Sequence, residues 1–166
     1  MIALRQVLAA AEDVQTFCLK QGWRFCFIGG LARQRWGEPR LTQDADLTLL
    51  AGFGNEEFFI DVVLANYAAR RADARDFALR YRVLLLQTRR GIAVDMALGA
   101  LPFEERTVER ASAWSWAPNH QLTTCSAEDL IIHKVFAARD RDWGDVESVL
   151  IRQYGKLNLK QIHTEL

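Results

Sequence analysis

Three aspartates are the residues whose type and spacing best fit catalysis. Asp44 and Asp46 are separated by one residue in the segment DADLTLL, whose β-branched and apolar residues predict a strand. Side chains alternate between the two faces of a strand, so both carboxylates share one face while Ala45, Leu47 and Leu49 face the core. Neighbouring like charges repel each other unless a cation holds them. Carboxylate oxygens suit Mg²⁺, although two solvated aspartates at a strand end are the alternative.

Asp95, in the segment GIAVDMAL, offers a third carboxylate. Ile92, Val94 and Met96 form one face of the expected strand, and Asp95 lies on the other face between small residues. Taken alone, this aspartate is equally compatible with a position facing solvent. Three carboxylates together can hold two divalent ions, which activate an attacking hydroxyl and neutralise a leaving pyrophosphate. The combination therefore favours phosphoryl or nucleotidyl transfer.

A glycine pair, Gly29 and Gly30, stands between the apolar segment WRFCFI and a short helical segment at 31–36. Glycine lets backbone approach a ligand closely, and the first turn of a helix presents free N–H groups that bind phosphate. We therefore expect this pair to bind the triphosphate of a nucleotide. Most glycine pairs are ordinary turns, so the interpretation of this pair as a phosphate site depends on the aspartates that follow it.

The elements that position these residues follow from the spacing of apolar residues. A first helix is expected over 4–18, with a stop at Gly22, and another is expected from Asn55 to about Arg71. The apolar and β-branched runs predict strands at 23–28, 44–50, 81–88 and 92–98. The last two strands flank Arg89-Arg90-Gly91, which is a hairpin signal.

The remainder of the chain is expected to be mainly helical. Pro102 opens a short helix, and residues 112–124 are compatible with two short strands. Ser126 and Asp129 resemble a capping box that starts a helix running into the 140s, where Gly144 is expected to divide it. We predict one α/β (α+β) domain over 1–166, with a mixed sheet of about four to five strands flanked by helices. Its core is expected at 23–100 and a C-terminal helical part at 126–166.

Composition narrows the classes of function. The chain has 166 residues, of which 50% are hydrophobic, and its 21 basic residues balance 21 acidic ones. No overall field therefore steers it toward nucleic acid or a membrane. The three cysteines are widely spaced in apolar stretches, which favours buried free thiols in a reducing compartment. No secretion signal or membrane span is recognisable, so we expect a cytoplasmic protein with no membrane partner.

The stretch from Gly29 to Asp46 resembles the signature of the DNA polymerase β-like nucleotidyltransferase superfamily. That signature is a GG or GS turn, about a dozen residues, and then a D-x-D pair. Within the superfamily, R-x-T-x-D-x-D at 40–46, G-x-x-V-D at 91–95 and the segment from Glu128 to Lys134 resemble the abortive-infection (AbiEii-type) toxin branch. The resemblance covers roughly residues 23–150 and implies a palm-like sheet. It departs at Gly30, where many members carry a serine that contacts phosphate.

The resemblance also implies roles for single residues. Two Mg²⁺ ions, with Mn²⁺ as a substitute, would be held by the catalytic residues Asp44, Asp46 and Asp95, the last of which would also help to deprotonate the acceptor. The nucleotide phosphates would be bound by Gly29, Gly30, Arg40, Thr42 and Lys134. Lys134 is expected on a helical stripe with Ala138, Arg141 and Asp145. The alternative to a phosphate-binding role is that Lys134 is an ordinary surface lysine.

We therefore expect an enzyme that moves a nucleoside monophosphate from an NTP, such as ATP, to a hydroxyl acceptor. The resemblance makes a tRNA, another RNA or a protein the acceptor, and it implies a toxin of a toxin–antitoxin or phage-defence system with an antitoxin partner. A small-molecule transferase of the antibiotic-modifying type is the alternative enzyme. A catalytically silent binding module is the alternative outside enzymes, and the presence of all three carboxylates argues against it.

A run of arginines lies between the expected helix at 55–71 and the hairpin. Its members are Arg70, Arg71, Arg75, Arg80, Arg82, Arg89 and Arg90. Such a run is compatible with the phosphates of an RNA acceptor and with an ordinary solvated basic face. Because these residues follow the expected helix, we expect them to lie outside the metal motif.

Overall fold

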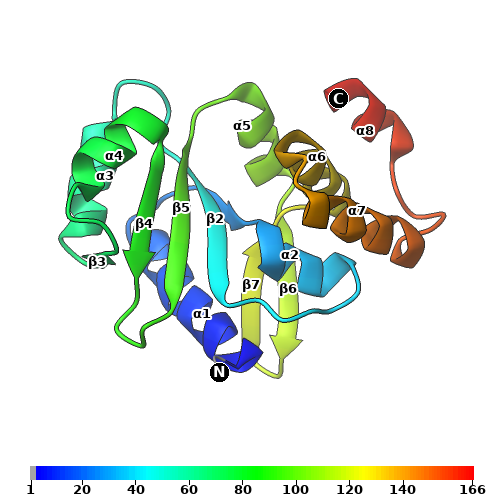
Figure 1. Ribbon diagram of the computed structural model, residues 1–166, viewed down its shortest axis with the longest axis horizontal. Helices are drawn as coiled ribbons and strands as arrows, with labels where there is room; N and C mark the ends of the chain where they lie inside the picture. Colours follow the sequence, from blue (N-terminus) through cyan, green and yellow to red (C-terminus); the bar gives the residue numbers. More distant parts are fainter. Residues whose placement is uncertain (1–2) are drawn as a thin grey trace.

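A computed structural model describes residues 3–166, and its central feature is a seven-stranded mixed sheet (Figure 1). The strand order is β3-β4-β5-β2-β1-β7-β6. β2 pairs in parallel with β5, and β1 pairs in parallel with β7, whereas the other neighbours are antiparallel. The mixed α/β class is confirmed, with more strands than the four to five expected.

The first half of the chain supplies the centre of the sheet. α1 (Leu4–Lys20) buries a helical stripe and ends before Gly22, whose φ of 72° is favourable for glycine. β1 (Phe25–Phe27) is completely buried and leads directly into α2 (Gly29–Trp36). β2 (Asp44–Leu50) then returns beside β1. The expected strand at 44–50 has the observed bounds, and the strand expected at 23–28 is shorter than predicted.

The edge of the sheet corrects one expected helix. α3 (Glu56–Leu64) ends seven residues before Arg71 and is followed by β3 (Ala68–Ala69) and α4 (Ala74–Tyr81). Segment 65–73 is rich in good helix formers, but it offers the core few apolar side chains. Pairing with the free edge of β4 (Val83–Gln87) satisfies its backbone instead. β4 and β5 (Ala93–Gly99) form the expected hairpin.

The last third of the chain contains α5 (Pro102–Glu109), β6 (Ser112–Ala117), β7 (His120–Thr124), α6 (Ala127–Ala137), α7 (Asp140–Arg152) and α8 (Leu159–Glu165). Ser126 caps α6 as expected, because its hydroxyl accepts a hydrogen bond from the Asp129 N–H at 3.0 Å. The expected break at Gly144 is wrong. The chain turns at Ala138, whose φ is 48°, and the Asp142 carboxylate caps the new helix by accepting from the Arg139 N–H.

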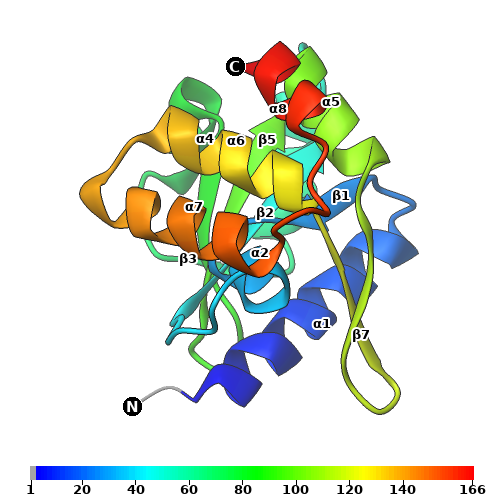
Figure 2. The same cartoon turned by 90° about the vertical axis from the view of Figure 1, so that its right-hand side faces the viewer.

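Helices cover both faces of the sheet (Figure 2). α1 packs on one face, where it shares a large apolar cluster with Ala45, Leu47 and Leu49 of β2. α2, α6 and α7 lie on the other face and enclose a second cluster around Cys26, Cys125 and Leu130. All three cysteines are free and buried, as expected. Among the helices of residues 3–166, none combines the length and apolarity required to cross a membrane.

Candidate active site

The pairing of β2 with β5 brings the three aspartates together. In this parallel pair Asp46 is directly opposite Asp95, and Asp44 precedes Asp46 on the same face. One carboxylate oxygen from each residue lies within 4.8 Å of the others. Ala45 and Leu47, which alternate with the aspartates, are fully buried on the opposite face. The expected convergence of the three carboxylates is therefore present.

The two glycines place the start of α2 against this cluster. Gly29 has a φ of 58°, and a Cβ there would overlap the Asp46 carboxylate. A Cβ on Gly30 would overlap the hydroxyl of Thr42. The Gly30 N–H forms a backbone hydrogen bond that lowers the pKa of Asp46. The glycines are thus required for contact between helix and aspartates as well as for any approach of phosphate.

The pKa values of Asp46 and Asp95 show that the cluster holds more negative charge than its surroundings favour, which suits the binding of a cation. Burial, followed by the charges of Asp44 and Asp95, raises the pKa of Asp46 to about 6, against the lowering effects of Gly30 and Lys134. Burial and Asp44 also raise the pKa of Asp95, although Arg70 opposes them. Hard oxygen donors with this excess of negative charge fit a magnesium-like ion.

Arg70 is a member of the site that the sequence did not indicate. Its backbone N–H donates to the carbonyl of Leu85 at 2.9 Å and so extends the edge pairing of β3 with β4. Leu85 is opposite Asp95, and the Arg70 guanidinium donates to the Asp95 carboxylate. The expectation that the arginine run lies outside the metal motif is therefore wrong for Arg70. Only the pairing of β3 with β4 reveals this contact, because 25 residues separate the two side chains.

Several other arginines of the run are neutralised locally. Arg71 binds Asp73, Arg75 binds Glu57 and Asp61, and Arg82 binds Glu56. Arg90 lies 3.7 Å from Asp13. The positive charge available to an RNA at this surface is thus smaller than the sequence alone suggests.

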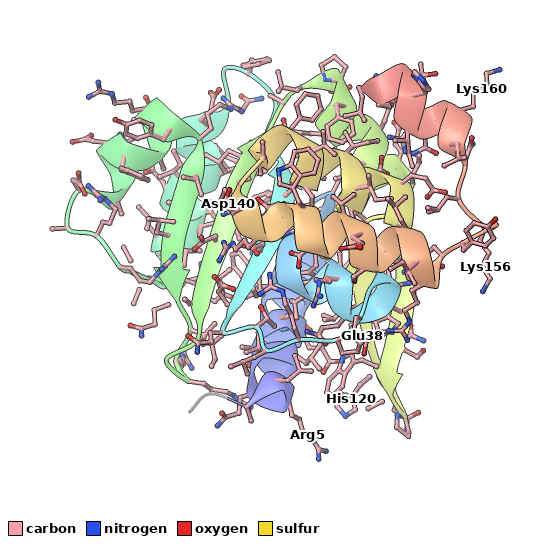
Figure 3. The ribbon with its side chains drawn as sticks, turned by 45° about the vertical axis from the view of Figure 1, so that its right-hand side comes forward. Arg5, Glu38, His120, Asp140, Lys156 and Lys160 are labelled. Carbon is pink, nitrogen blue, oxygen red and sulfur yellow. The ribbon has the colours of Figure 1, made fainter. Side chains whose placement is uncertain are left out.

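Cations from α2, from the segment that follows it and from α6 form a cluster, and two buried carboxylates of α7 organise it. The Lys134 ammonium lies 2.9 Å from Asp142 and 2.8 Å from Asp145. Asp145 also accepts two hydrogen bonds from Arg40, at 3.1 and 3.0 Å, and pairs with Arg33 at 2.8 Å. In Figure 3, α7 begins at Asp140 and crosses in front of α2. This crossing places the acidic residues of α7 among cations from both α2 and α6.

Lys134 differs from both of its sequence-based descriptions. It is only 7% exposed, so the alternative of a surface lysine is wrong. The continuous stripe with Ala138 and Arg141 is also wrong, because α6 ends at Ala137. Lys134 does contact Asp145 of that stripe, and Asp142 is the partner that sequence reasoning missed. Its position three residues before Asp145, on the same helical face, was the available signal.

A cavity of about 520 Å³ connects these groups. Its lining includes the three aspartates, Gly29 and Gly30 at the start of α2, and the cations Arg40, Lys134, Arg139 and Arg141. Val83, Ala97, His133 and Ala137 also line the cavity. Thr42 also lines the cavity, and its hydroxyl lies 3.3 Å from the Asp44 carbonyl. Such an arrangement can hold a polyphosphate between cations and metal-bound carboxylates.

Comparisons with solved structures agree with this fold. An antigenic nucleotidyltransferase-like protein from Paracoccidioides brasiliensis has a TM-score of 0.60 at 11% identity, covering 98% of this chain and 88% of its own. The lincomycin-bound lincosamide adenylyltransferase LnuA gives 0.54 at 10% identity, covering 85% and 94%. The antibiotic-resistance factor ANT(2'')-Ia gives 0.58 at 12% identity, covering 95% and 88%. At these identities the likeness establishes the nucleotidyltransferase fold.

The sequence itself matches a family model. No curated protein matches the chain. Residues 19–154 match the model of the nucleotidyl transferase AbiEii toxin of type IV toxin–antitoxin systems. That range contains the glycine pair, all three aspartates, Lys134 and the acidic residues of α7. The chain therefore belongs to the AbiEii family of nucleotidyltransferases, and it is an enzyme of that class.

Proposed function

We propose that the protein transfers a nucleoside monophosphate from an NTP to a hydroxyl acceptor, using divalent metal at Asp44, Asp46 and Asp95. The observation that carries this proposal is the convergence of the three carboxylates within 4.8 Å in a cavity that cations also line. Membership of the AbiEii family supports the same reaction class. The complete set of carboxylates argues against a silent binding module.

The donor set supports Mg²⁺, with Mn²⁺ as a substitute, and the expectation of two ions follows from the three shared carboxylates. When bound, the metal would supply charge neutralisation at the leaving pyrophosphate and activation of the acceptor hydroxyl. Asp44 and Asp46 would hold both ions from β2, and Asp95 would hold the catalytic one from β5.

The triphosphate is assigned to the start of α2 and to the cations. Gly29 and Gly30 offer backbone N–H groups, while Arg40 and Lys134 offer positive charge that Asp145 holds in place. Thr42 completes this set. Its hydroxyl occupies the space where a side chain on Gly30 would stand. It can therefore replace the serine that many relatives of this superfamily carry at that position.

In the proposed reaction, the acceptor oxygen forms a bond to the α-phosphorus of the NTP. The bond from that phosphorus to the bridging oxygen breaks, and pyrophosphate leaves with the electron pair. Asp95 receives the proton of the acceptor hydroxyl. The Arg70 guanidinium donates to the same carboxylate, so Arg70 is placed to orient Asp95 and to lower its affinity for the proton.

We infer that the acceptor is a tRNA or another RNA, or a protein, and that the enzyme acts as a toxin with an antitoxin partner. The type IV toxin–antitoxin assignment of the family supports this inference. Small-molecule acceptors are the second candidate. The structural likeness to a lincomycin-bound lincosamide adenylyltransferase and to an antibiotic-resistance factor supports this candidate.

Incubation with each α-³²P-labelled NTP, Mg²⁺ and total tRNA or cell extract tests the proposal. Label on tRNA or on protein identifies a macromolecular acceptor, and release of pyrophosphate with lincomycin or another antibiotic identifies a small one. Asp46→Asn is expected to abolish every transfer, whereas the exposed Asp140→Asn on α7 is the matched control. Transfer that persists in Asp46→Asn contradicts the assignment. Growth arrest of host cells by the wild type but not by Asp46→Asn tests the toxin role.

A further inference from the structure

The Arg70 guanidinium lies beside Asp95 and leaves most of its N–H groups unused. One nitrogen donates to the Asp95 carboxylate, and within residues 3–166 the guanidinium has no other hydrogen-bond partner. Its side chain is 33% exposed. The neighbouring cations differ, because Arg71 and Arg75 each use two nitrogens on carboxylates and Arg82 uses three on local acceptors. Arg70 therefore retains donors for a ligand at the edge of the reaction centre.

Arg70 and the start of α2 lie on opposite flanks of the carboxylates. A Cβ on Gly29 would overlap Asp46, so α2 begins at the β2 side of the cluster. Arg70 reaches Asp95 from beyond Leu85, which lies opposite Asp95 on β4. Since the strand order is β4-β5-β2-β1, the two contacts approach the carboxylates from two sides. Figure 1 shows β4 on one side of β5 and β2, and α2 on the other side.

The face of β4 that adjoins Asp95 is accessible to a ligand. Val83 and Leu85 belong to this face, and both are half-buried. The residues that alternate with them, Leu84 and Leu86, are fully buried on the opposite face of the sheet. A substrate can therefore lie over β4 next to the carboxylate of Asp95.

The in-line course of phosphoryl transfer favours this flank for the acceptor. The attacking and leaving oxygens lie roughly in line through the phosphorus. The proposed function assigns the triphosphate, and with it the leaving pyrophosphate, to the flank where α2 begins. The acceptor hydroxyl then approaches from the opposite flank, over β4, where Arg70 lies.

A guanidinium in this position suits a phosphate of the acceptor. Its planar fork matches phosphate oxygens in two parallel hydrogen bonds. Under the proposed function, Asp95 shares its charge with a divalent metal, so its ion pair with Arg70 no longer offsets the guanidinium fully. In an RNA whose terminal hydroxyl reacts, a single sugar separates that hydroxyl from the nearest phosphate. A protein hydroxyl brings no phosphate to this position, so Arg70 favours RNA among the candidate acceptors.

We propose that Arg70 binds the acceptor RNA through the phosphate next to the reacting hydroxyl, while another of its nitrogens holds Asp95. One side chain then sets the terminal sugar against the carboxylate that receives its proton. The inference rests on the proposed function and uses the same reaction. The terminal oxygen bonds to the α-phosphorus, pyrophosphate leaves with the electron pair, and the RNA gains one nucleotide.

The first test measures binding of fluorescently labelled total tRNA to the full chain, with Mg²⁺ and without NTP, over a range of salt concentrations. Arg70→Gln is expected to weaken binding about tenfold, as for one lost hydrogen bond to a charged group. The slope of log affinity against log salt is expected to flatten by about 0.7, the value for one phosphate on a single strand. Arg71→Gln is the matched control and is expected to change neither quantity, because Arg71 is adjacent but pairs with the exposed Asp73. Mg²⁺-NTP affinity, measured by calorimetry, is expected to fall in neither variant.

The second test identifies the phosphate. A tRNA is rebuilt by ligation to a synthetic 3′ end whose last phosphodiester is an uncharged methylphosphonate. The wild type is expected to bind this RNA about tenfold more weakly than the unmodified one, whereas Arg70→Gln is expected to lose nothing further. A methylphosphonate placed several nucleotides upstream is the control and is expected to affect both proteins equally. A purely structural role of Arg70 would not produce this loss of additivity.

Three outcomes would overturn the contact while leaving the proposed function standing. They are equal losses in Arg70→Gln and Arg71→Gln, additive losses for Arg70→Gln and the terminal methylphosphonate, and a wild type that binds Mg²⁺-NTP but neither binds nor labels tRNA. Label that appears on a protein or on a small molecule instead belongs to the third outcome. If the wild type binds no NTP with Mg²⁺ and labels no acceptor, the proposed function itself fails.

Discussion

At the scale of single residues, Asp46 is a carboxylate whose ionised form is disfavoured by its surroundings. It is a carboxylate whose pKa of about 6 reflects burial first and the two neighbouring aspartates second. Above pH 6 the metal-free fold therefore carries an ionised group in an unfavourable place. A site that costs stability when empty is common where a ligand supplies the missing charge.

Asp46→Asn is expected to raise the melting temperature of the metal-free protein at pH 7.5 by a few degrees, since it removes a repelled charge worth about 1 kcal/mol. Adding Mg²⁺ is expected to stabilise the wild type and to leave the variant nearly unchanged. Thermal denaturation with EDTA or with Mg²⁺ measures both effects. A variant that melts lower than the wild type in EDTA would show that the carboxylate stabilises the empty fold.

Two glycines with similar backbone conformations offer a matched pair. Gly22 has a φ of 72° with nothing within 4 Å of an added Cβ, whereas Gly29 has a φ of 58° with Asp46 in the way. Gly22→Ala is expected to cost about 1 kcal/mol of unfolding free energy through backbone strain alone. Gly29→Ala is expected to cost more and to abolish Mg²⁺-dependent stabilisation. Urea unfolding with and without Mg²⁺ separates the two, and equal costs would mean that Gly29 is only a turn.

At the scale of elements, the junction of α6 and α7 determines where the cations lie. Asp142 is 1% exposed and receives hydrogen bonds from Arg139 at 2.7 Å and from Lys134 at 2.9 Å. Although burial raises the pKa of Asp142, these two partners outweigh it and lower the value to about 2. The same carboxylate caps α7, so one side chain joins the turn at Ala138 to the orientation of Lys134.

Asp142→Asn is expected to lower the unfolding free energy at pH 7 by about 3 kcal/mol, because Lys134 loses part of its buried counterion. The pKa is lower in the folded state than the value of 3.8 for a free aspartate, so the stabilisation is present above pH 4. It is lost as the pH falls toward 2. The difference between variant and wild type, measured by urea unfolding across this range, is expected to shrink accordingly. A difference that is constant with pH would exclude the ion pair as its cause.

Sequence patterns predicted the elements that carry the aspartates, because their signals are local. The alternation in 44–50 and 92–98 correctly placed the carboxylates on one face of each strand. The ends of other elements depended on distant partners. Segment 65–73 has helical propensity, but its residues Ala68–Ala69 pair with β4, and α6 ends at Ala137 although the next residue, Ala138, carries no breaker signal. Arg70 became visible only through a contact between strands, whereas the spacing of Asp142 from Asp145 on one helical face was a local signal.

At the scale of the whole molecule, a net charge of zero conceals a separation of charge. The three carboxylates lie on β2 and β5, whereas Lys134 and Arg141 lie on α6 and α7, and all of them line one cavity. The cavity between them attracts a polyanion from one side and repels it from the other. Under the proposed function a bound metal would remove the repulsion, so metal binding and nucleotide binding are expected to be coupled.

Removal of metal with EDTA is therefore expected to weaken NTP binding by at least tenfold. Lys134→Met is expected to weaken binding whether or not Mg²⁺ is present, since it removes attraction rather than repulsion. In Asp46→Asn, the dependence of NTP affinity on Mg²⁺ is expected to diminish, because less repulsion needs to be relieved. Calorimetric titration in EDTA and in Mg²⁺ tests all three. NTP affinity that is independent of Mg²⁺ in the wild type would contradict the coupling.

The direct pairing of β2 with β5 makes the positions of the aspartates independent of the chain that connects these two strands. Register between these neighbours fixes Asp46 opposite Asp95, whatever chain connects the two strands. The connection, residues 51–92, carries α3, β3, α4 and β4 and forms one margin of the sheet (Figure 1). Its outer segment, 55–81, delivers Arg70 to Asp95 but does not set the spacing of the aspartates. A change in that segment is therefore expected to alter the surroundings of Asp95 while the three carboxylates stay together.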